Sequence, residues 1–125
     1  MDRQTHVAFG EVVADVAASS GRRVAFVASC DWSHTHKGSR YGENVVAAES
    51  LDGAVVEALQ VGDPGRMIEL DAALVDSAAI DGLWQALMLA GVLNRVPMRV
   101  EFLGYEVAEH FSTGLAVAAF TPAMV

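Results

Sequence analysis

The chain has 125 residues, of which 53% are hydrophobic and 19% are charged, and its formal net charge at pH 7 is -8. This length fits one domain with a single modest core, which we place at residues 1–125. Nucleic-acid binding needs clustered Lys and Arg, and the 8 that are present are scattered, so the composition argues against a nucleic-acid partner.

The apolar residues occur in short segments. No uninterrupted apolar run approaches the roughly 20 residues that a membrane-spanning helix needs. The residues up to His6 are polar and unlike a signal peptide. We therefore expect a cytoplasmic protein that does not bind a membrane. The apolar fraction is still high for so small a domain, which predicts a homo-oligomer or a missing part of a larger protein.

Residues 5–19 have the spacing of an amphipathic helix, with Thr5 as the expected N-cap and Gly21 at the C-terminal turn. The side chains expected to face the core recur at i, i+3, i+4 and i+7: Phe9, Val12, Val13, Val16. An apolar run at residues 24–29 follows. Its length and composition predict a buried strand covered by helices on both sides.

Residues 37–49 break the periodicity and predict a long loop, which is either functional or a mobile surface segment. A helical pattern then runs from Ser50, the expected N-cap, to Gly62. The side chains expected on its buried face are these: Leu51, Val55, Leu59.

Three aspartates precede further helical patterns. Asp63 stands before Pro64 and opens a short helix, and Asp71 is the expected cap of a second. Asp81 is the expected cap of a third helix, residues 82–93, which is apolar almost all round. Such a helix is typically buried.

The apolar period changes to two after the last helix. Residues 98–102 predict a half-exposed strand and residues 113–121 a final strand. Residues 105–111 between them are ambiguous, with His110 expected in a solvated turn. The element order predicts an α/β domain with a small sheet of about three strands packed with helices. So small and apolar a sheet is typical of part of a larger fold.

Polar side chains cluster where the first predicted strand ends: Asp31, Ser33, His34, His36. In open α/β sheets this is the end at which ligands bind. A metal site formed by the carboxylate and the two histidines is the weakest interpretation. Proton transfer by a histidine beside a carboxylate, and a strand end capped by Asp31 and Ser33, are about equally supported.

The neighbouring Cys30 is the single cysteine, which excludes an intramolecular disulfide and a multi-cysteine zinc site. A nucleophilic role with His34 as base is less favoured than a small buried side chain. Trp32 is expected to pack in the core rather than to stack on a ligand.

The residues from Arg23 to His34 read RVAFVASCDWSH. They resemble the RVAxIxSGDLSH segment of the class III extradiol ring-cleavage dioxygenases, the LigB-like superfamily. Shorter similarities follow in the same order and cover nearly the whole chain: Tyr41-Gly42, Leu51-Asp52, Gly62-Asp63, Gly82-Leu83, Gly91, Gly104-Tyr105-Glu106, and Gly114 to Phe120.

The resemblance implies part of an Fe(II) enzyme that uses O₂ to open catechol-type rings beside the diol. In that family two His and one Glu hold the iron. The resemblance implies an acid/base role for His34, with Asp31 and Ser33 shaping the turn that aims it. His36 and Tyr41 would lie on the substrate side.

The chain also departs from the family pattern. The two iron-binding histidines belong to the family's N-terminal half, so we expect this chain to correspond to the C-terminal portion. The iron-binding Glu matches Gly82, and the adjacent Asp81 would be rotated by about 100° on a helix. Cys30 replaces the glycine of the SGD motif.

We therefore expect that this chain alone binds no iron and is inactive. The missing N-terminal half or a partner subunit would complete the enzyme, whose ligand would be a catechol-type small molecule. The alternative is a non-catalytic LigB-like binding or assembly module.

Overall fold

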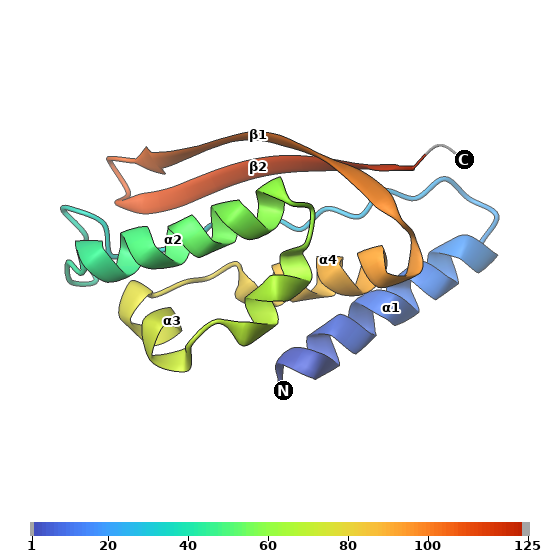
Figure 1. Ribbon diagram of the computed structural model, residues 1–125, viewed down its shortest axis with the longest axis horizontal. Helices are drawn as coiled ribbons and strands as arrows, with labels where there is room; N and C mark the ends of the chain where they lie inside the picture. The colour runs from blue at the N-terminus through green and yellow to red at the C-terminus, as the bar shows by residue number, and fades with distance from the viewer. Residues whose placement is uncertain (1, 124–125) are drawn as a thin grey trace.

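The computed structural model describes residues 2–123 and has a mixed α/β architecture, as predicted (Figure 1). One layer is a two-stranded antiparallel hairpin, and the helices lie on one side of it. The elements in chain order are α1 (Arg3–Ser19), α2 (Val45–Gln60), the 3-10 helix η1 (Pro64–Glu69), α3 (Ala72–Ala78), α4 (Leu83–Arg95), β1 (Met98–Ala108) and β2 (Thr113–Pro122).

The predicted strand at residues 24–29 is not part of a sheet, so the described residues form two strands rather than about three. The segment crosses the molecule as an open stretch of chain without helical turns (Figure 1). Its exposure still alternates, because Phe26 and Ala28 are partly buried whereas Ala25, Val27 and Ser29 are exposed. Within residues 2–123, no main-chain group of residues 23–28 forms a hydrogen bond with the backbone of another segment. The side-chain pattern of a strand is present, but no neighbouring strand pairs with it.

Helix α1 packs against α4 through two glycines. A Cβ added to Gly10 would lie 1.8 Å from the carbonyl oxygen of Met88, and one added to Gly91 would lie 2.0 Å from that of Val7. Any larger residue at either position would force the two backbones apart. The helices therefore approach at backbone distance, which small residues allow.

The predicted core face of α1 is wrong. Phe9, Val12 and Val16 are 56%, 57% and 61% exposed. The buried face contains smaller residues, including Gly10 and Ala14. The helix is apolar on two faces, and the close approach to α4 selects the face with the smaller side chains.

The start of α1 is also earlier than predicted. Asp2 rather than Thr5 is the N-cap, and its carboxylate accepts the backbone N–H of Thr5 at 2.8 Å. Helix α2 likewise begins at Val45 rather than near Ser50. Asn44 is its cap and accepts the backbone N–H of Ala47 at 3.2 Å. The preceding loop is correspondingly shorter than predicted.

The predicted caps of the three later helices are confirmed only in part. Asp71 caps α3, accepting the N–H of Leu74 at 3.0 Å, as predicted. Asp63 precedes η1 with Pro64 in the first turn, but its side chain makes no capping bond. The predicted cap of α4 is wrong, because Gly82 rather than Asp81 occupies that position.

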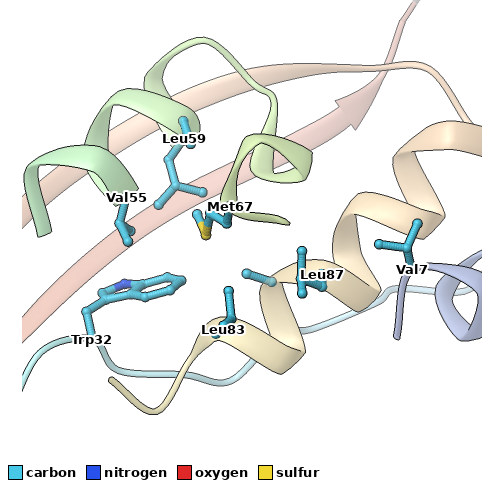
Figure 2. Packing of buried hydrophobic residues seen from close by; sticks show 9 residues of the cluster. Val7, Trp32, Val55, Leu59, Met67, Leu83 and Leu87 are labelled. Atoms are coloured by element: carbon cyan, nitrogen blue, oxygen red, sulfur yellow. The ribbon is translucent and has the colours of Figure 1, made fainter. Parts of the chain in front are cut away.

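The core lies between the helices and the inner face of the hairpin. Figure 2 shows the Trp32 indole between Val55 of α2 and Leu83 of α4, with Met67 of η1 close by. Trp32 is 2% exposed, so the expectation that it packs in the core is confirmed. The predicted buried face of α2 is also confirmed: Leu51, Val55, Leu59.

The ambiguous residues after 105 continue β1 to Ala108, and the chain then turns into β2. His110 is exposed in this turn, as predicted. Cross-strand pairs such as Val100 with Phe120 fix the antiparallel register, which shifts at a bulge between Phe102 and Gly104. The turn brings one end of the hairpin close to the polar cluster that follows residue 30.

Candidate functional site

A cleft of about 480 Å³ lies between two segments that are distant in sequence. Residues 31–41 supply one wall, and residues 108–115 at the hairpin turn supply the other. Main-chain hydrogen bonds hold the walls together. Trp32 N–H donates to Gly114 O at 2.9 Å, and His36 N–H donates to Ser112 O at 3.3 Å.

His34 is held at this cleft by the end of α3. Its backbone N–H donates to Ala78 O at 2.9 Å, and its ring Nδ1 is 2.7 Å from Ala79 O. A carbonyl oxygen only accepts, so we assign the ring proton to Nδ1. Ala79 has a left-handed backbone with φ of 50°, which ends α3 and turns its carbonyl toward the ring. The second nitrogen, Nε2, is thereby left free to exchange a proton.

Asp31 lies beside that second nitrogen. Its Oδ1 is 3.2 Å from His34 Nε2, and the two side chains are 38% and 20% exposed. The same oxygen atom is buried and has no hydrogen-bond partner within the described structure. The pair is therefore at ion-pair distance without a formed hydrogen bond. Both atoms are hydrogen-bond acceptors, so the pair suits a ligand with two hydroxyls, one donating to Nε2 and the other to the Asp31 carboxylate.

His36 is in a different environment although it is only two residues away. Its Nε2 is 2.7 Å from Asp52 Oδ2, and the side chains are 6% and 2% exposed. Tyr105 O–H donates to the same carboxylate oxygen. Ser33 N–H donates to Asp52 Oδ1 at 3.1 Å. The Asp52 side chain thus accepts hydrogen bonds from the main chain of Ser33, the His36 ring and the Tyr105 hydroxyl, and it fastens these groups to α2.

Burial, followed by the hydrogen bond to Asp52, raises the pKa of Tyr105. A raised pKa keeps the phenol protonated and able to donate to the carboxylate. The network is therefore a closed set of matched donors and acceptors. Because each of these buried polar groups has a hydrogen-bond partner, we interpret the network as a structural unit beneath the cleft.

The remaining predicted site residues divide between these two environments. Tyr41 lines the cleft, and its ring meets the His34 ring edge-on with centroids 6.2 Å apart. Ser33 is fully buried, and its hydroxyl donates to Ala48 O of α2 at 3.4 Å. The structure thus brings Asp31, His34 and Tyr41 to the cleft, and it places Ser33 and His36 beneath it.

Cys30 is a partly buried thiol rather than an exposed nucleophile. Burial raises its pKa to about 11, with the charges of Asp31 and Asp81 contributing in the same direction. Only a small fraction of the thiol is ionised near pH 7, and the thiolate is the reactive form.

The described side chains do not fit the iron site of the family. Within residues 2–123, no group of three or more His, Cys, Asp and Glu side chains is arranged to hold a metal ion. Position 82, which the resemblance matches to the iron-binding Glu, has no room for a side chain. A Cβ there would lie 2.6 Å from Cys30 Cβ and 2.7 Å from Asp31 O. A glycine at this position lets the start of α4 pack directly on residues 30–32.

Sequence reasoning missed several residues of this region. Arg40 and His110 both line the cleft. The position of His110 depends on the fold, which brings the hairpin turn next to residues 31–41. Asp52 could have been found, since it is a carboxylate on an otherwise apolar helix face. Such a residue needs buried partners. Tyr105 stands in one of the segments that resemble the family, but nothing in the sequence indicated that it would bind Asp52.

No helix in the described part of the chain is long and apolar enough to cross a membrane. No curated protein gives a significant match to the chain. The model of one family, described as the catalytic LigB subunit of aromatic ring-opening dioxygenase, matches residues 1–116. This match spans nearly the whole chain, including both walls of the cleft and the network beneath it. The chain therefore belongs to the LigB family of aromatic ring-opening dioxygenases.

Proposed function

We propose that this chain forms one wall of the active site of an extradiol-type dioxygenase, in which His34 exchanges a proton with a catechol-type diol. The observation that carries the proposal is the arrangement at the cleft. His34 Nδ1 is committed to Ala79 O, while Nε2 lies 3.2 Å from the unpartnered Oδ1 of Asp31.

The chemistry assigned to this chain is limited to binding the diol and moving its proton. A diol hydroxyl at the cleft donates its proton to Nε2, and the resulting imidazolium donates to Asp31 and to Ala79 O. Return of that proton to the opened product restores the neutral ring. A positioned histidine of this kind typically contributes a rate factor of about 10² to 10⁴.

We further propose that the family's Fe(II) ligands come from a partner that this chain needs, namely the N-terminal half of a LigB-like fold or a separate subunit. The unpaired residues 23–28 support this proposal, because a strand added there would satisfy their main-chain groups. Val24 and Val27 within this segment are 57% and 80% exposed. The exposed apolar face of α1 adds further surface for such a partner.

The diol-binding proposal is tested by titrating the protein with catechol under anaerobic conditions, followed by NMR. We expect saturable binding with shifts at His34, and a loss of about tenfold or more in affinity in His34→Ala. His6→Ala is the matched control, since His6 lies outside the cleft, against Trp84. Equal catechol affinity in the wild type and His34→Ala would remove His34 from the proposal.

The partner proposal is tested by Fe(II) binding and by sizing. We expect no tight 1:1 binding of Fe(II) to this chain, and concentration-dependent self-association through the exposed surface. Val27→Lys should weaken that association, whereas Val46→Lys on α2 is a control of equal exposure, at 81% against 80%. Stoichiometric iron binding to this chain alone would contradict the proposal, and a monomer at every concentration would contradict the expected self-association.

A non-catalytic binding module is the second candidate, and one observation favours it. The closed packing around Gly82 leaves no place for a carboxylate side chain there. If the chain with its partner bound catechol and Fe(II) but consumed no O₂, this candidate would replace the first.

A further inference from the structure

The loop between the cleft and α2, residues 37–44, has a defined shape. Gly38 N–H donates to Glu43 Oε1 at 2.7 Å, which closes the loop across its base. Gly38 and Gly42 have φ of 85° and 97°, in the left-handed region that favours glycine, so the chain turns on either side of residues 39–41. The sequence left open whether this loop is functional or mobile, and these bonds favour a functional wall of the cleft.

Ser39 lies in this loop and is partly buried. Its hydroxyl donates to the main-chain carbonyl of His34, five positions earlier, and accepts the main-chain N–H of Tyr41 at 3.1 Å. The rings of these two partners meet edge-on in the cleft, with their centroids 6.2 Å apart. One hydroxyl thus joins the main chains of the two residues whose rings are in contact.

His34 is consequently held on both sides of its Cα. The end of α3 holds one side, where the His34 N–H donates to Ala78 O at 2.9 Å and the ring Nδ1 lies 2.7 Å from Ala79 O. The Ser39 hydroxyl holds the carbonyl on the other side. The bonds to α3 fix where the imidazole enters the cleft, whereas the bond to Ser39 fixes the loop, and with it Tyr41, relative to that imidazole.

A second serine makes the same pair of bonds elsewhere in the chain. At the end of α1, the Ser20 hydroxyl donates to Ala17 O at 2.7 Å and accepts the N–H of Arg22 at 3.1 Å. Serine hydroxyls commonly close turns in this way. The two serines therefore make equivalent local bonds, and they differ in that the partners of Ser39 are residues of the cleft. Ser20 is the matched control for any effect of Ser39 on the site.

We infer that Ser39 is a positioning residue for the cleft, which keeps Tyr41 against the ring of His34. This inference rests on the proposed function and adds a residue that acts on the same site through its two neighbours. Loss of the hydroxyl frees the main chain of Tyr41 from that of His34, while the bond between Gly38 and Glu43 still closes the loop. Ser39 itself takes no part in proton transfer.

The first test is an NMR measurement that needs no ligand. The ring current of Tyr41 displaces the signals of the carbon-bound protons on the His34 ring, and Tyr41→Leu gives their positions without it. We expect Ser39→Ala to move these signals most of the way to the Tyr41→Leu positions. Ser39→Thr, which keeps a hydroxyl, should restore the wild-type positions, and Ser20→Ala should leave them unchanged. Wild-type positions in Ser39→Ala, or an equal displacement in Ser20→Ala, would overturn the inference.

The second test is anaerobic titration of the same variants with catechol. We expect Ser39→Ala to weaken catechol binding about threefold to tenfold, the effect of one lost hydrogen bond, and Ser39→Thr to restore it. Ser20→Ala should bind as the wild type does. Unchanged affinity in Ser39→Ala would overturn the inference and leave the diol site standing. Absence of catechol binding by the wild type would overturn the proposed function, whereas the ligand-free spectra would still decide whether Ser39 holds Tyr41 against His34.

Discussion

His34 and His36 lie two residues apart and belong to two different parts of the molecule. The first is partly exposed at the cleft, with one ring nitrogen fixed by α3 and the other beside an unpartnered carboxylate oxygen. The second is buried on Asp52, whose oxygens are saturated by donors. The incomplete hydrogen bonding at His34 leaves its ring able to exchange a proton, whereas the complete hydrogen bonding around His36 makes that residue structural.

The strongest test of this comparison is Asp52→Ala. The change leaves His36, Tyr105 and the Ser33 N–H without their shared acceptor in a buried site. We expect it to lower the free energy of unfolding by about 3–5 kcal/mol. Denaturant unfolding measures the loss, and Asp76→Ala on the exposed side of α3 is the control, expected to change stability by no more than about 0.5 kcal/mol. A loss as small as that of the control would mean that the network is not structural.

Alanine substitution of each histidine in turn tests the comparison directly. His36→Ala strips one donor from a buried carboxylate and should cost about 1–3 kcal/mol of stability. His34→Ala should cost less than about 1 kcal/mol, because the freed Ala79 carbonyl can bind water at the cleft. Thermal and urea unfolding of the two variants give the difference. The reverse order of stability would break the assignment of the two sites.

Tyr105 contributes less to stability than Asp52, and its contribution depends on pH. Its pKa is raised in the folded protein by burial and by Asp52. Above about pH 10 the unfolded chain loses a proton that the folded chain keeps. Stability is therefore complete below that pH and falls as pH rises through the folded pKa.

Tyr105→Phe should cost about 1 kcal/mol at pH 7 and should remove part of this alkaline loss. Unfolding measured between pH 8 and 11 detects it, with Tyr41→Phe as the control at the exposed cleft. An identical pH profile in wild type and Tyr105→Phe would show that Asp52 does not hold the phenol in its protonated form.

Local patterns in the sequence predicted the elements whose causes are local. The cap at Asp71, the packed face of α2 that includes Val55, and the last strand all follow from spacing and composition. His34 could be singled out as a polar residue after an apolar run. The different surroundings of His34 and His36 could not be predicted, since they depend on the end of α3 and on Asp52.

Two other failures have physical causes of the same kind. Helix α1 is apolar on two faces, and the choice between them depends on the contact of Gly10 with Gly91, which lies 81 positions further along the chain. Residues 24–29 carry the side-chain pattern of a strand, but a strand exists only where another pairs with it. The local pattern of a segment predicts its type of secondary structure but not which other segment packs or pairs with it.

The unpaired segment also has a consequence for how the protein behaves in solution. Residues 24–29 read VAFVAS, which contains no charge and no proline, and such six-residue stretches are prone to form cross-β aggregates. Charged residues flank the stretch, with Arg22 and Arg23 before it and Asp31 after it. Flanking charges of this kind act as gatekeepers that oppose stacking of identical strands. The isolated chain should therefore resist fibril formation only as long as these charges remain.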